Sequence, residues 1–160
     1  MRSKVLRIPK DRIKVIGKAM QAKIEKRLGV KLGINQEVKI SSEDPLSLLK
    51  AELVIKAIGR GFSPIKALEL SKEGVSLRIM NISDYAKTRK AIKRLKGRVI
   101  GKGGKARKTL ENITNTYISV YGKTISIIGE AENILKAWKA INMLLEGRKH
   151  QTVYRYLENE

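Results

Sequence analysis

Glycine and basic residues crowd one short stretch of the chain, "KGRVIGKGGKARKTLENI" at residues 96–113. Its central run, Gly101-Lys102-Gly103-Gly104, stands before an apolar-periodic segment that predicts a helix, and the first backbone N–H groups of a helix have no partner within it. Glycine has no Cβ to hold a ligand away from the main chain, and Lys102 and Lys105 add electrostatic attraction. These residue types at this spacing predict a site for phosphate groups.

The charge around this stretch has a single sign. Residues 87–108 contain eleven Lys and Arg residues and no Asp or Glu, whereas a helix surface that only faces water normally mixes the two signs. The whole chain of 160 residues has 35 Lys and Arg residues against 15 Asp and Glu residues, a formal net charge of +20. The composition therefore predicts a polyanionic partner.

Residues suited to catalysis or metal binding are scarce. The chain has no cysteine and one histidine, His150, so disulfides are excluded and a histidine metal site or a Ser-His-Asp triad is very hard to build. We interpret His150 as a surface or hydrogen-bonded residue. The glycine run lacks the G-x-x-x-x-G-K-[ST] spacing of nucleotide-binding loops. We expect a protein that is not an enzyme and that uses no cofactor, metal or small-molecule substrate.

The hydropathy pattern indicates a globular protein. Hydrophobic residues make up 42% of the chain, which is enough to bury a core. No apolar run is long enough to span a membrane, and no charged segment followed by a short apolar one predicts a signal peptide. We expect a cytoplasmic protein without a membrane partner.

The second half of the chain predicts the order β-α-α-β-β-α. A strand over 75–82 alternates apolar and polar residues. A helix capped by Ser83 or Asp84 should follow and end before Gly97. A second helix should follow the glycine run. The residues expected to be apolar-facing in these elements are Val75, Leu77 and Ile79 in the strand, Tyr85, Thr88, Ile92 and Leu95 in the first helix, and Ala106, Leu110 and Ile113 in the second.

A hairpin and a long helix complete this half. The segments "YISVY" and "TISII" predict two strands that turn at Gly122-Lys123. The last helix should cover 130–146 and stop at Gly147. Trp138 falls on its apolar stripe with Ile134 and Ile141, so we interpret it as a core residue rather than a stacking platform for bases.

The two halves of the chain are related in sequence. "KVIGKAMQAKIEKRLGVKLGI" at 14–34 resembles "RVIGKGGKARKTLENITNTYISV" at 98–120. With a two-residue deletion in the first copy, Ile24 aligns with Leu110, Glu25 with Glu111 and Leu32 with Ile118. An internal duplication is therefore predicted.

The first half follows the same order less clearly. We expect a strand over 5–8, helices over 11–16 and 22–28, a strand over 37–40, and a helix over 45–58. Asp44 should cap this last helix, with Pro45 at its first position. Residues 60–74, with a short helix that opens at Ser63-Pro64 and closes at Gly74, are interpreted as a connector. Residues 148–160 are a C-terminal extension, expected to be helical and to dock through Val153, Tyr154 and Leu157.

The glycine loop and the segments after it resemble the KH domain of the eukaryotic and archaeal type. In that family an I-G-x-x-G loop joins the first two helices of a β-α-α-β-β-α fold, and "VIGKGGKARKTLENITNTYISVYGKTISIIG" contains the loop and both following strands in order. The resemblance covers 75–147. It implies an α+β fold of two tandem type I KH domains, the first at 1–59 and degenerate, plus the helical extension.

The resemblance also implies which residues contact RNA. The loop pattern maps onto Ile100 to Gly104, which would clamp the RNA backbone beside a shallow apolar groove for unpaired bases. Many KH domains have an apolar residue where this chain has Arg107, which suggests a polar or charged base contact. The full set of expected RNA-binding residues is Arg94, Arg98, Val99, Ile100, Gly101, Lys102, Gly103, Gly104, Lys105, Ala106, Arg107, Lys108, Leu110 and Ile118.

The first copy departs from the pattern. Gly17-Lys18-Ala19-Met20 retains one glycine and lacks the second, and we expect the helix after it to be about two residues shorter. Close approach of a phosphate to the backbone should fail there. We interpret residues 1–59 as a KH-like unit kept for structure, extra basic surface or a protein contact, with RNA binding by another face as the alternative.

More narrowly, the tandem arrangement with its extension resembles the archaeal members of the family of partner-of-NOB (Dim-two) small-subunit assembly factors. This resemblance implies single-stranded RNA binding near the 3′ end of small-subunit ribosomal RNA during maturation, with an assembly nuclease or another pre-ribosome protein as a further partner. Two alternatives are a stable component of a ribosome- or exosome-associated particle and a nuclease. A nuclease would need an acidic metal-binding cluster, which is not recognisable among the fifteen acids.

Overall fold

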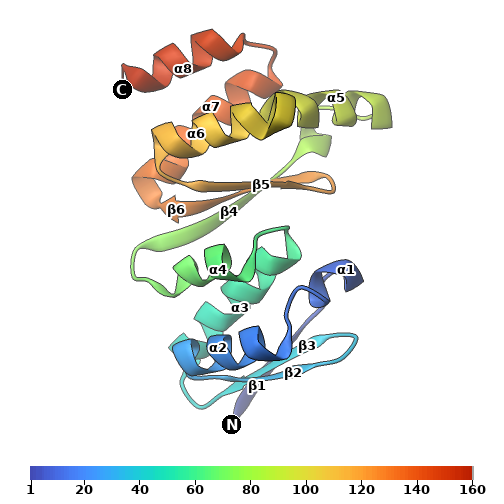
Figure 1. The fold of residues 1–160 in the computed structure, drawn as a ribbon, viewed down its shortest axis with the longest axis vertical. Helices are drawn as coiled ribbons and strands as arrows, with labels where there is room; N and C mark the ends of the chain where they lie inside the picture. The colour runs from blue at the N-terminus through green and yellow to red at the C-terminus, as the bar shows by residue number, and fades with distance from the viewer. Residues whose placement is uncertain (160) are drawn as a thin grey trace. The chain divides into compact units, whose positions relative to one another are not determined.

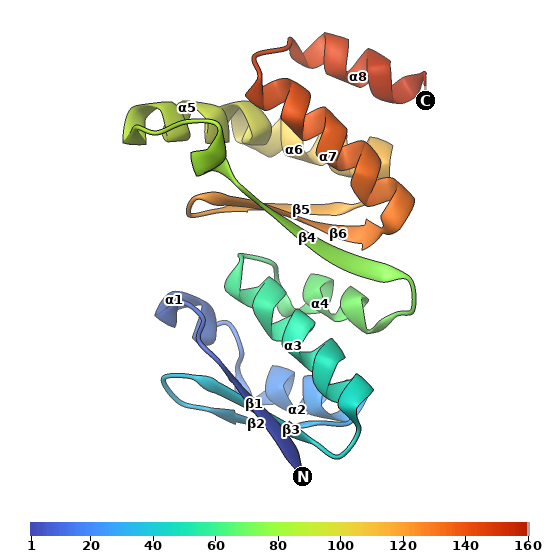
Figure 2. The same cartoon turned by 180° about the vertical axis from the view of Figure 1, so that it is seen from behind.

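The computed structural model describes residues 1–159, which form two compact units, residues 1–75 and residues 76–159. We refer to them as the N-terminal unit and the C-terminal unit. Figures 1 and 2 show each unit as a small sheet with helices on one of its faces.

The C-terminal unit contains a three-stranded sheet and four α-helices. The strands are β4 (Val75–Asn81), β5 (Tyr117–Tyr121) and β6 (Thr124–Glu130), in the spatial order β4-β6-β5. The helices are α5 (Arg89–Ile100), α6 (Lys105–Thr114), α7 (Ala131–Leu145) and α8 (His150–Glu158). In Figure 1, α5, α6 and α7 lie on one face of the sheet, and α8 packs against α6 and α7.

The central strand of this sheet is the most buried one. Residues Thr124 to Ile128 of β6 are all buried. The β5–β6 pairing is antiparallel, from Tyr117 opposite Ile128 to Tyr121 opposite Thr124. The two-residue turn between them contains Gly122 with a φ of 55°, which confirms the predicted hairpin.

The core of the C-terminal unit joins all four helices to the sheet. Val153 and Leu157 of α8 are buried in the same cluster as residues of α5, α6 and α7, so the predicted docking of the extension is confirmed. Trp138 is half-buried at the margin of this core, and the Arg78 guanidinium lies over its ring at 3.7 Å from the centroid. The central core residues are Ile92, Leu95, Val99, Leu110, Ile125, Ile127, Ile141 and Leu144.

The N-terminal unit has the same sequence of elements. Its strands are β1 (Arg2–Leu6), β2 (Lys31–Ile34) and β3 (Val38–Ser42), in the spatial order β1-β3-β2. Its helices are α1 (Lys10–Ile13), α2 (Lys18–Leu28), α3 (Pro45–Gly59) and α4 (Pro64–Ala67), followed by a 3₁₀ helix, η1 (Leu68–Ser71). Ala67, Leu68 and Leu70 are buried, and α4 and η1 pack against α3. The segment interpreted as a connector is therefore part of the core of this unit.

Equivalent hydrogen bonds support the alignment of the two copies. The Glu25 carboxylate accepts a hydrogen bond from the Leu32 N–H at 2.9 Å, and the Glu111 carboxylate accepts one from the Ile118 N–H at 2.8 Å. The residue after each helix, Gly29 or Asn115, has a left-handed backbone. The same helix-to-strand junction is thus built twice, at the positions that the sequence alignment pairs.

Helix α5 begins and ends later than predicted. Thr88 is its cap, because its side-chain oxygen accepts a hydrogen bond from the Ala91 N–H at 3.1 Å, while Ile82–Asp84 form a separate 3₁₀ turn, η2. The helix continues through Gly97 to Ile100, since one internal glycine costs only about 1 kcal/mol relative to alanine. Tyr85 therefore lies outside α5, and its hydroxyl donates to Asn142 Oδ1.

The burial of β4 follows the predicted alternation. Val75, Leu77 and Ile79 are half-buried while Ser76 and Arg78 are exposed. Met80, which was not singled out, is buried in the core.

Two predictions for the first half were wrong. Strand β2 was missed, because Gly33 interrupts its apolar alternation and glycine is depleted in strands. Helix α2 has 11 residues and α6 has 10, so the helix of the first copy is not the shorter one. The two residues that the first copy lacks are missing from the loop before the helix, because α2 begins directly after Gly17.

The remaining predictions for this half agree with the structure to within a few residues. Asp44 caps α3 by accepting a hydrogen bond from the Leu46 N–H, and Pro45 is the first helical residue. Ser63 caps α4 in the same way through the Lys66 N–H. Between residues 1 and 159 the structure has no helix with the length and apolar character needed to cross a membrane.

Candidate nucleic-acid interface

The glycine loop lies between α5 and α6 and has an unusual backbone. Gly101, Gly103 and Gly104 have φ values of 74°, 62° and 78°, in a region that other L-residues rarely adopt. A short 3₁₀ turn, η3 (Lys102–Gly104), closes the loop, with a hydrogen bond from the Gly104 N–H to the Gly101 carbonyl. Three glycines are therefore needed to hold this shape.

The glycines of the loop have different surroundings. A Cβ on Gly101 would lie 2.6 Å from the Ala106 Cβ and 2.7 Å from its backbone nitrogen, so Gly101 is required for the loop to pack on α6. A Cβ on Gly103 would meet nothing within 4 Å. The backbone at Gly103 is consequently open to an external group, and the protein itself does not fill that space.

The start of α6 presents free N–H groups and positive charge. Neither η3 nor α6 has a side-chain cap, and the first turn of α6 contains no acidic residue. Lys102 and Lys105 are exposed beside these groups. A helix N-terminus favours anions through its unpaired N–H groups and its dipole. The geometry suits a phosphate at this loop.

Most of the expected apolar groove residues belong to the core. Val99, Ala106, Leu110 and Ile118 are all buried, because their side of α5, α6 and β5 faces the other elements of the unit. Ile100 is half-buried. The apolar surface available to a base beside the loop is therefore smaller than the sequence indicated.

Arg107 is held in place by a chain of contacts. Its Nη1 donates to Glu111 Oε1 at 2.8 Å, and Glu111 Oε2 accepts from the Ile118 N–H of β5 at 2.8 Å. The Nη2 atom lies 3.9 Å from the position that a Cβ on Gly104 would occupy. The guanidinium is thus placed between the glycine loop and the edge strand β5. The role of Glu111 was not predicted, although its four-residue spacing from Arg107 is the distance of one helical turn.

Arg98 and Arg94 have different environments. Arg98 Nε donates to the Leu144 carbonyl at 2.9 Å, and its Nη2 donates to the Arg148 carbonyl, so these donors join α5 to the end of α7. His150 Nε2 lies 2.8 Å from the Arg98 carbonyl oxygen, which agrees with the hydrogen-bonded role expected for this histidine. Arg94 is exposed. Of the two, Arg94 is the one available to a ligand.

The outer side of α5 is basic along its whole length. No acidic residue occurs in α5, and none of its basic side chains forms an ion pair with any residue that the structure describes. Pairs such as Arg89 and Lys93, four residues apart, repel each other and lower helix stability slightly. Gly97 adds an exposed position with nothing within 4 Å of its would-be Cβ. The stability of the helix does not explain this composition, whereas a polyanion beside it would.

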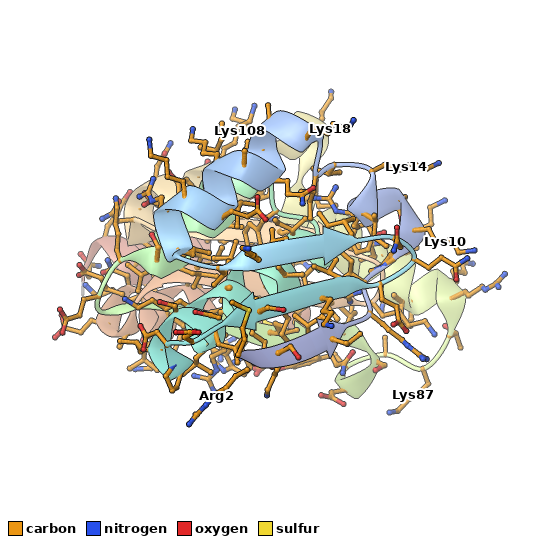
Figure 3. The ribbon with its side chains drawn as sticks, turned by 90° about the horizontal axis from the view of Figure 1, so that it is seen from below. Arg2, Lys10, Lys14, Lys18, Lys87 and Lys108 are labelled. Carbon is orange, nitrogen blue, oxygen red and sulfur yellow. The ribbon has the colours of Figure 1, made fainter. Side chains whose placement is uncertain are left out.

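The equivalent loop of the N-terminal unit is built differently. Gly17 caps α2 with an ordinary φ of −76°, and α2 begins at Lys18. Residues 17–20 contain no left-handed backbone. Figure 3 shows Lys14 and Lys18 pointing outward, and Lys108 of the C-terminal unit does so as well. The N-terminal unit therefore offers positive charge near the start of α2 without an open glycine turn.

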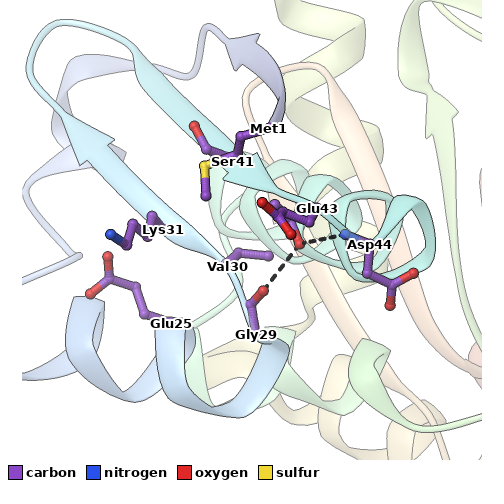
Figure 4. Close-up of a pocket in the computed structure, with 9 residues that line it drawn as sticks. Met1, Glu25, Gly29, Val30, Lys31, Ser41, Glu43 and Asp44 are labelled. Carbon is purple, nitrogen blue, oxygen red and sulfur yellow. Dashed lines mark hydrogen bonds between the residues drawn. The ribbon is translucent and has the colours of Figure 1, made fainter.

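A shallow hollow in the N-terminal unit is lined by groups that already have structural roles. Figure 4 shows Gly29, Ser41, Glu43 and Asp44 around it. Ser42 Oγ donates to the Gly29 carbonyl at 3.1 Å and accepts from the Asp44 N–H at 3.2 Å. Hydrogen bonds from the Ser47 hydroxyl and the Leu46 N–H hold the pKa of Asp44 below its usual value.

Across residues 1–159, no group of three His, Asp or Glu side chains could hold a metal ion.

The sheet order, the paired helices and the glycine loop between them define a KH domain. The family model for the second KH domain of PNO1, described as "Eukaryotic type KH-domain (KH-domain type I)", matches residues 76–160. The chain therefore belongs to the type I KH-domain family, and its C-terminal unit is a KH domain of the PNO1 type.

Similar proteins occur in archaea and eukaryotes. A KH domain-containing protein of Methanocaldococcus jannaschii is 46% identical over 98% of this chain and 73% of its own length. The RNA-binding protein PNO1 of Oryzias latipes is 35% identical over 75% of this chain and 51% of its own length. The chain thus spans about half the length of the PNO1 relatives that it matches.

Solved structures share the whole fold. Dim2p from Pyrococcus horikoshii OT3 superimposes with a TM-score of 0.91 at 44% identity, over 100% of both chains. A chain from the a/eIF2alpha-aDim2p-rRNA complex of the same organism matches with a TM-score of 0.90 at 42% identity, over 99% of this chain and 93% of that one. The likeness extends to both units of the chain.

Proposed function

We propose that the protein binds single-stranded RNA through the loop Gly101 to Gly104 and acts in assembly of the small ribosomal subunit, near the 3′ end of its RNA. The observation that carries this proposal is the open, left-handed backbone at Gly103 between two helices, beside free N–H groups and exposed lysines. The names of the relatives support it, because PNO1 is described as RNA-binding and Dim2p was solved with rRNA.

A single strand fits this site better than a duplex. The loop contacts backbone phosphate, while Arg107 lies half-buried between the loop and β5. A base must leave a stack to reach a group in that position, which is how sequence-specific RNA recognition usually works. Aromatic residues are only 4% of the chain, so stacking on exposed rings contributes little to the proposed mode of binding.

The N-terminal unit acts in this proposal as a degenerate KH domain. Its element order, its sheet order and its Glu25 hydrogen bond repeat those of the C-terminal unit. It lacks the glycine turn, so it supplies structure and basic surface, and it is a candidate contact for an assembly nuclease or another protein of the pre-ribosome. Cleavage of RNA by the pure protein with Mg²⁺ or Mn²⁺ would contradict the proposed non-enzymatic role.

Crosslinking in cells tests the proposed function directly. RNA crosslinked to the wild-type protein should map near the 3′ end of small-subunit rRNA, and a variant with Lys102→Asp and Gly103→Asp should lose these sites. An assembly factor should also be absent from mature subunits, whereas a stable component would remain with them. Crosslinks spread evenly over unrelated RNA in both proteins would overturn the assignment.

A further inference from the structure

The Arg107 guanidinium is a fixed group with unused hydrogen-bond donors. It is planar and has five N–H donors, and within the described chain its hydrogen bond is to Glu111 Oε1. The side chains of Arg107 and Glu111 are 25% and 13% exposed, so the pair is largely shielded while part of the Arg107 side chain remains accessible. Glu111 is itself anchored on the Ile118 N–H of β5, which limits the orientations of the guanidinium plane.

A fixed pair of parallel donors distinguishes the four bases. Guanine offers two adjacent acceptors, O6 and N7, and bidentate contact with arginine is the commonest specific contact to that base. Cytosine also presents two adjacent acceptors, O2 and N3. Adenine has the N6 donor beside N7, and uracil has the N3 donor beside its carbonyl oxygens. In both bases, one hydrogen-bond donor would therefore face a donor of the guanidinium. An unpaired donor at a half-buried site lowers affinity.

The N-terminal unit offers an internal comparison for this residue. The position equivalent to Arg107 is Gln21, whose Nε2 donates to the Leu32 carbonyl at 2.8 Å. Glu25 still accepts from the Leu32 N–H, so this glutamate contact forms in the N-terminal unit without an arginine beside it. The guanidinium is therefore an addition to the C-terminal unit that the shared architecture does not require.

We propose that Arg107, oriented by Glu111, selects a base with two adjacent acceptors at one position of the bound strand, guanine or cytosine in preference to adenine or uracil. This inference rests on the proposed RNA binding and assigns it a specificity. Arg107 touches the base in this scheme, and Glu111 is a positioning residue.

The test uses the full chain and a set of short single-stranded RNAs that differ at one position. Dissociation constants are measured at one fixed salt concentration with each of the four bases at each position in turn. The wild type should show one position where guanine or cytosine binds about tenfold more tightly than adenine and uracil. If guanine is preferred, 7-deazaguanine should remove the advantage, because it lacks the N7 acceptor. If cytosine is preferred, the 7-deazaguanine substitution does not apply. The contacted edge of cytosine is then the one that carries its adjacent acceptors, O2 and N3.

Three variants separate base selection from charge. Arg107→Lys retains the charge and the pairing with Glu111 but has no planar pair of donors, so overall affinity should remain while the base preference disappears. Lys108→Gln removes one exposed charge from the next residue of α6 and should weaken all four RNAs equally. Glu111→Gln should reduce the preference without abolishing binding, since the guanidinium loses its fixed orientation. Circular dichroism should show that all three stay folded.

The outcomes distinguish this inference from the proposed function. If the wild type binds none of the RNAs, the proposed function itself fails. If the wild type binds but shows no preference for guanine or cytosine at any position, or if Arg107→Lys retains that preference, the base-selecting role of Arg107 is wrong and RNA binding stands.

Discussion

In the N-terminal unit α2 begins directly after Gly17, whereas in the C-terminal unit a turn with three left-handed glycines separates α5 from α6. The helix-to-strand junction after each loop is the same, with Glu25 and Glu111 in equivalent hydrogen bonds. The comparison shows that the core of this fold does not depend on the glycine turn. The turn is therefore best explained by a ligand, and the variants below test that explanation by treating both units alike.

The largest difference between the two units is expected when the first glycine of each loop is replaced. Gly101→Ala should lower the free energy of unfolding by roughly 3 kcal/mol, because the left-handed backbone and the overlap with Ala106 both oppose a Cβ. Gly17→Ala should change it by less than about 0.5 kcal/mol, since its φ is ordinary and its surroundings are open. Urea denaturation measures both. Equal losses would show that the two loops are under the same constraint.

The second comparison concerns RNA affinity. Lys102→Asp with Gly103→Asp should reduce affinity at least tenfold, about 1.4 kcal/mol, because two carboxylates replace the space and charge offered to phosphate. Gly103 has nothing within 4 Å of its would-be Cβ, so the fold should survive. Lys18→Asp with Ala19→Asp makes the matched change at the start of α2 and should cost much less. A similar loss in both folded variants would contradict the structural role proposed for the N-terminal unit.

The third comparison concerns the salt dependence of binding. Changing Arg89, Lys90, Lys93 and Arg94 to glutamine should reduce the slope of log affinity against log salt by roughly 0.7 for each phosphate that is no longer neutralised by a basic side chain. The matched set on the N-terminal unit changes four exposed lysines, Lys10, Lys14, Lys18 and Lys23, and should alter the slope by less than the amount expected for one phosphate. If the N-terminal set had the larger effect, RNA would follow that unit rather than α5.

The smallest effect is expected at the caps of α3 and α7. Asp44 accepts hydrogen bonds from Leu46 and Ser47, whereas Glu130 at the matching position makes no capping bond. Asp44→Ala should lower the thermal midpoint slightly, and Glu130→Ala should not. Because the folded pKa of Asp44 is lowered, its contribution is present above the unfolded pKa of about 3.9 and is lost as the pH falls through the folded value. A midpoint difference between Asp44→Ala and wild type that stayed constant down to pH 2 would contradict this assignment.

The sequence was informative where one residue type decides the local structure. The loop Gly101 to Gly104, the turn at Gly122 and the cap at Asp44 each depend on a short motif, and each was located correctly. The start of α5 was not, because Ser83, Asp84 and Thr88 are all good caps and only tertiary packing selects among them. Burial beside the loop was also unpredictable, since Val99 and Ile118 could face either a groove or the core.

The interaction of Arg107 with Glu111 shows a different limit. Its spacing from Glu111 was visible in the sequence, but the anchoring of Glu111 on β5 requires the strand to be placed first. Likewise, the two-residue difference between the copies was assigned to the helix instead of the loop, because an alignment gap does not say which element absorbs it.

The packing of α8 has a consequence for the order in which the units form during synthesis. Val153 and Leu157 are buried in the core of the C-terminal unit, and the carbonyl of Arg148 receives the Arg98 side chain. The C-terminal unit therefore cannot complete its core until this late segment has left the ribosome. The core of the N-terminal unit is complete once Leu70 has emerged. Because domains generally fold as they are synthesised, the N-terminal unit should already be folded while the glycine loop still lacks its final support.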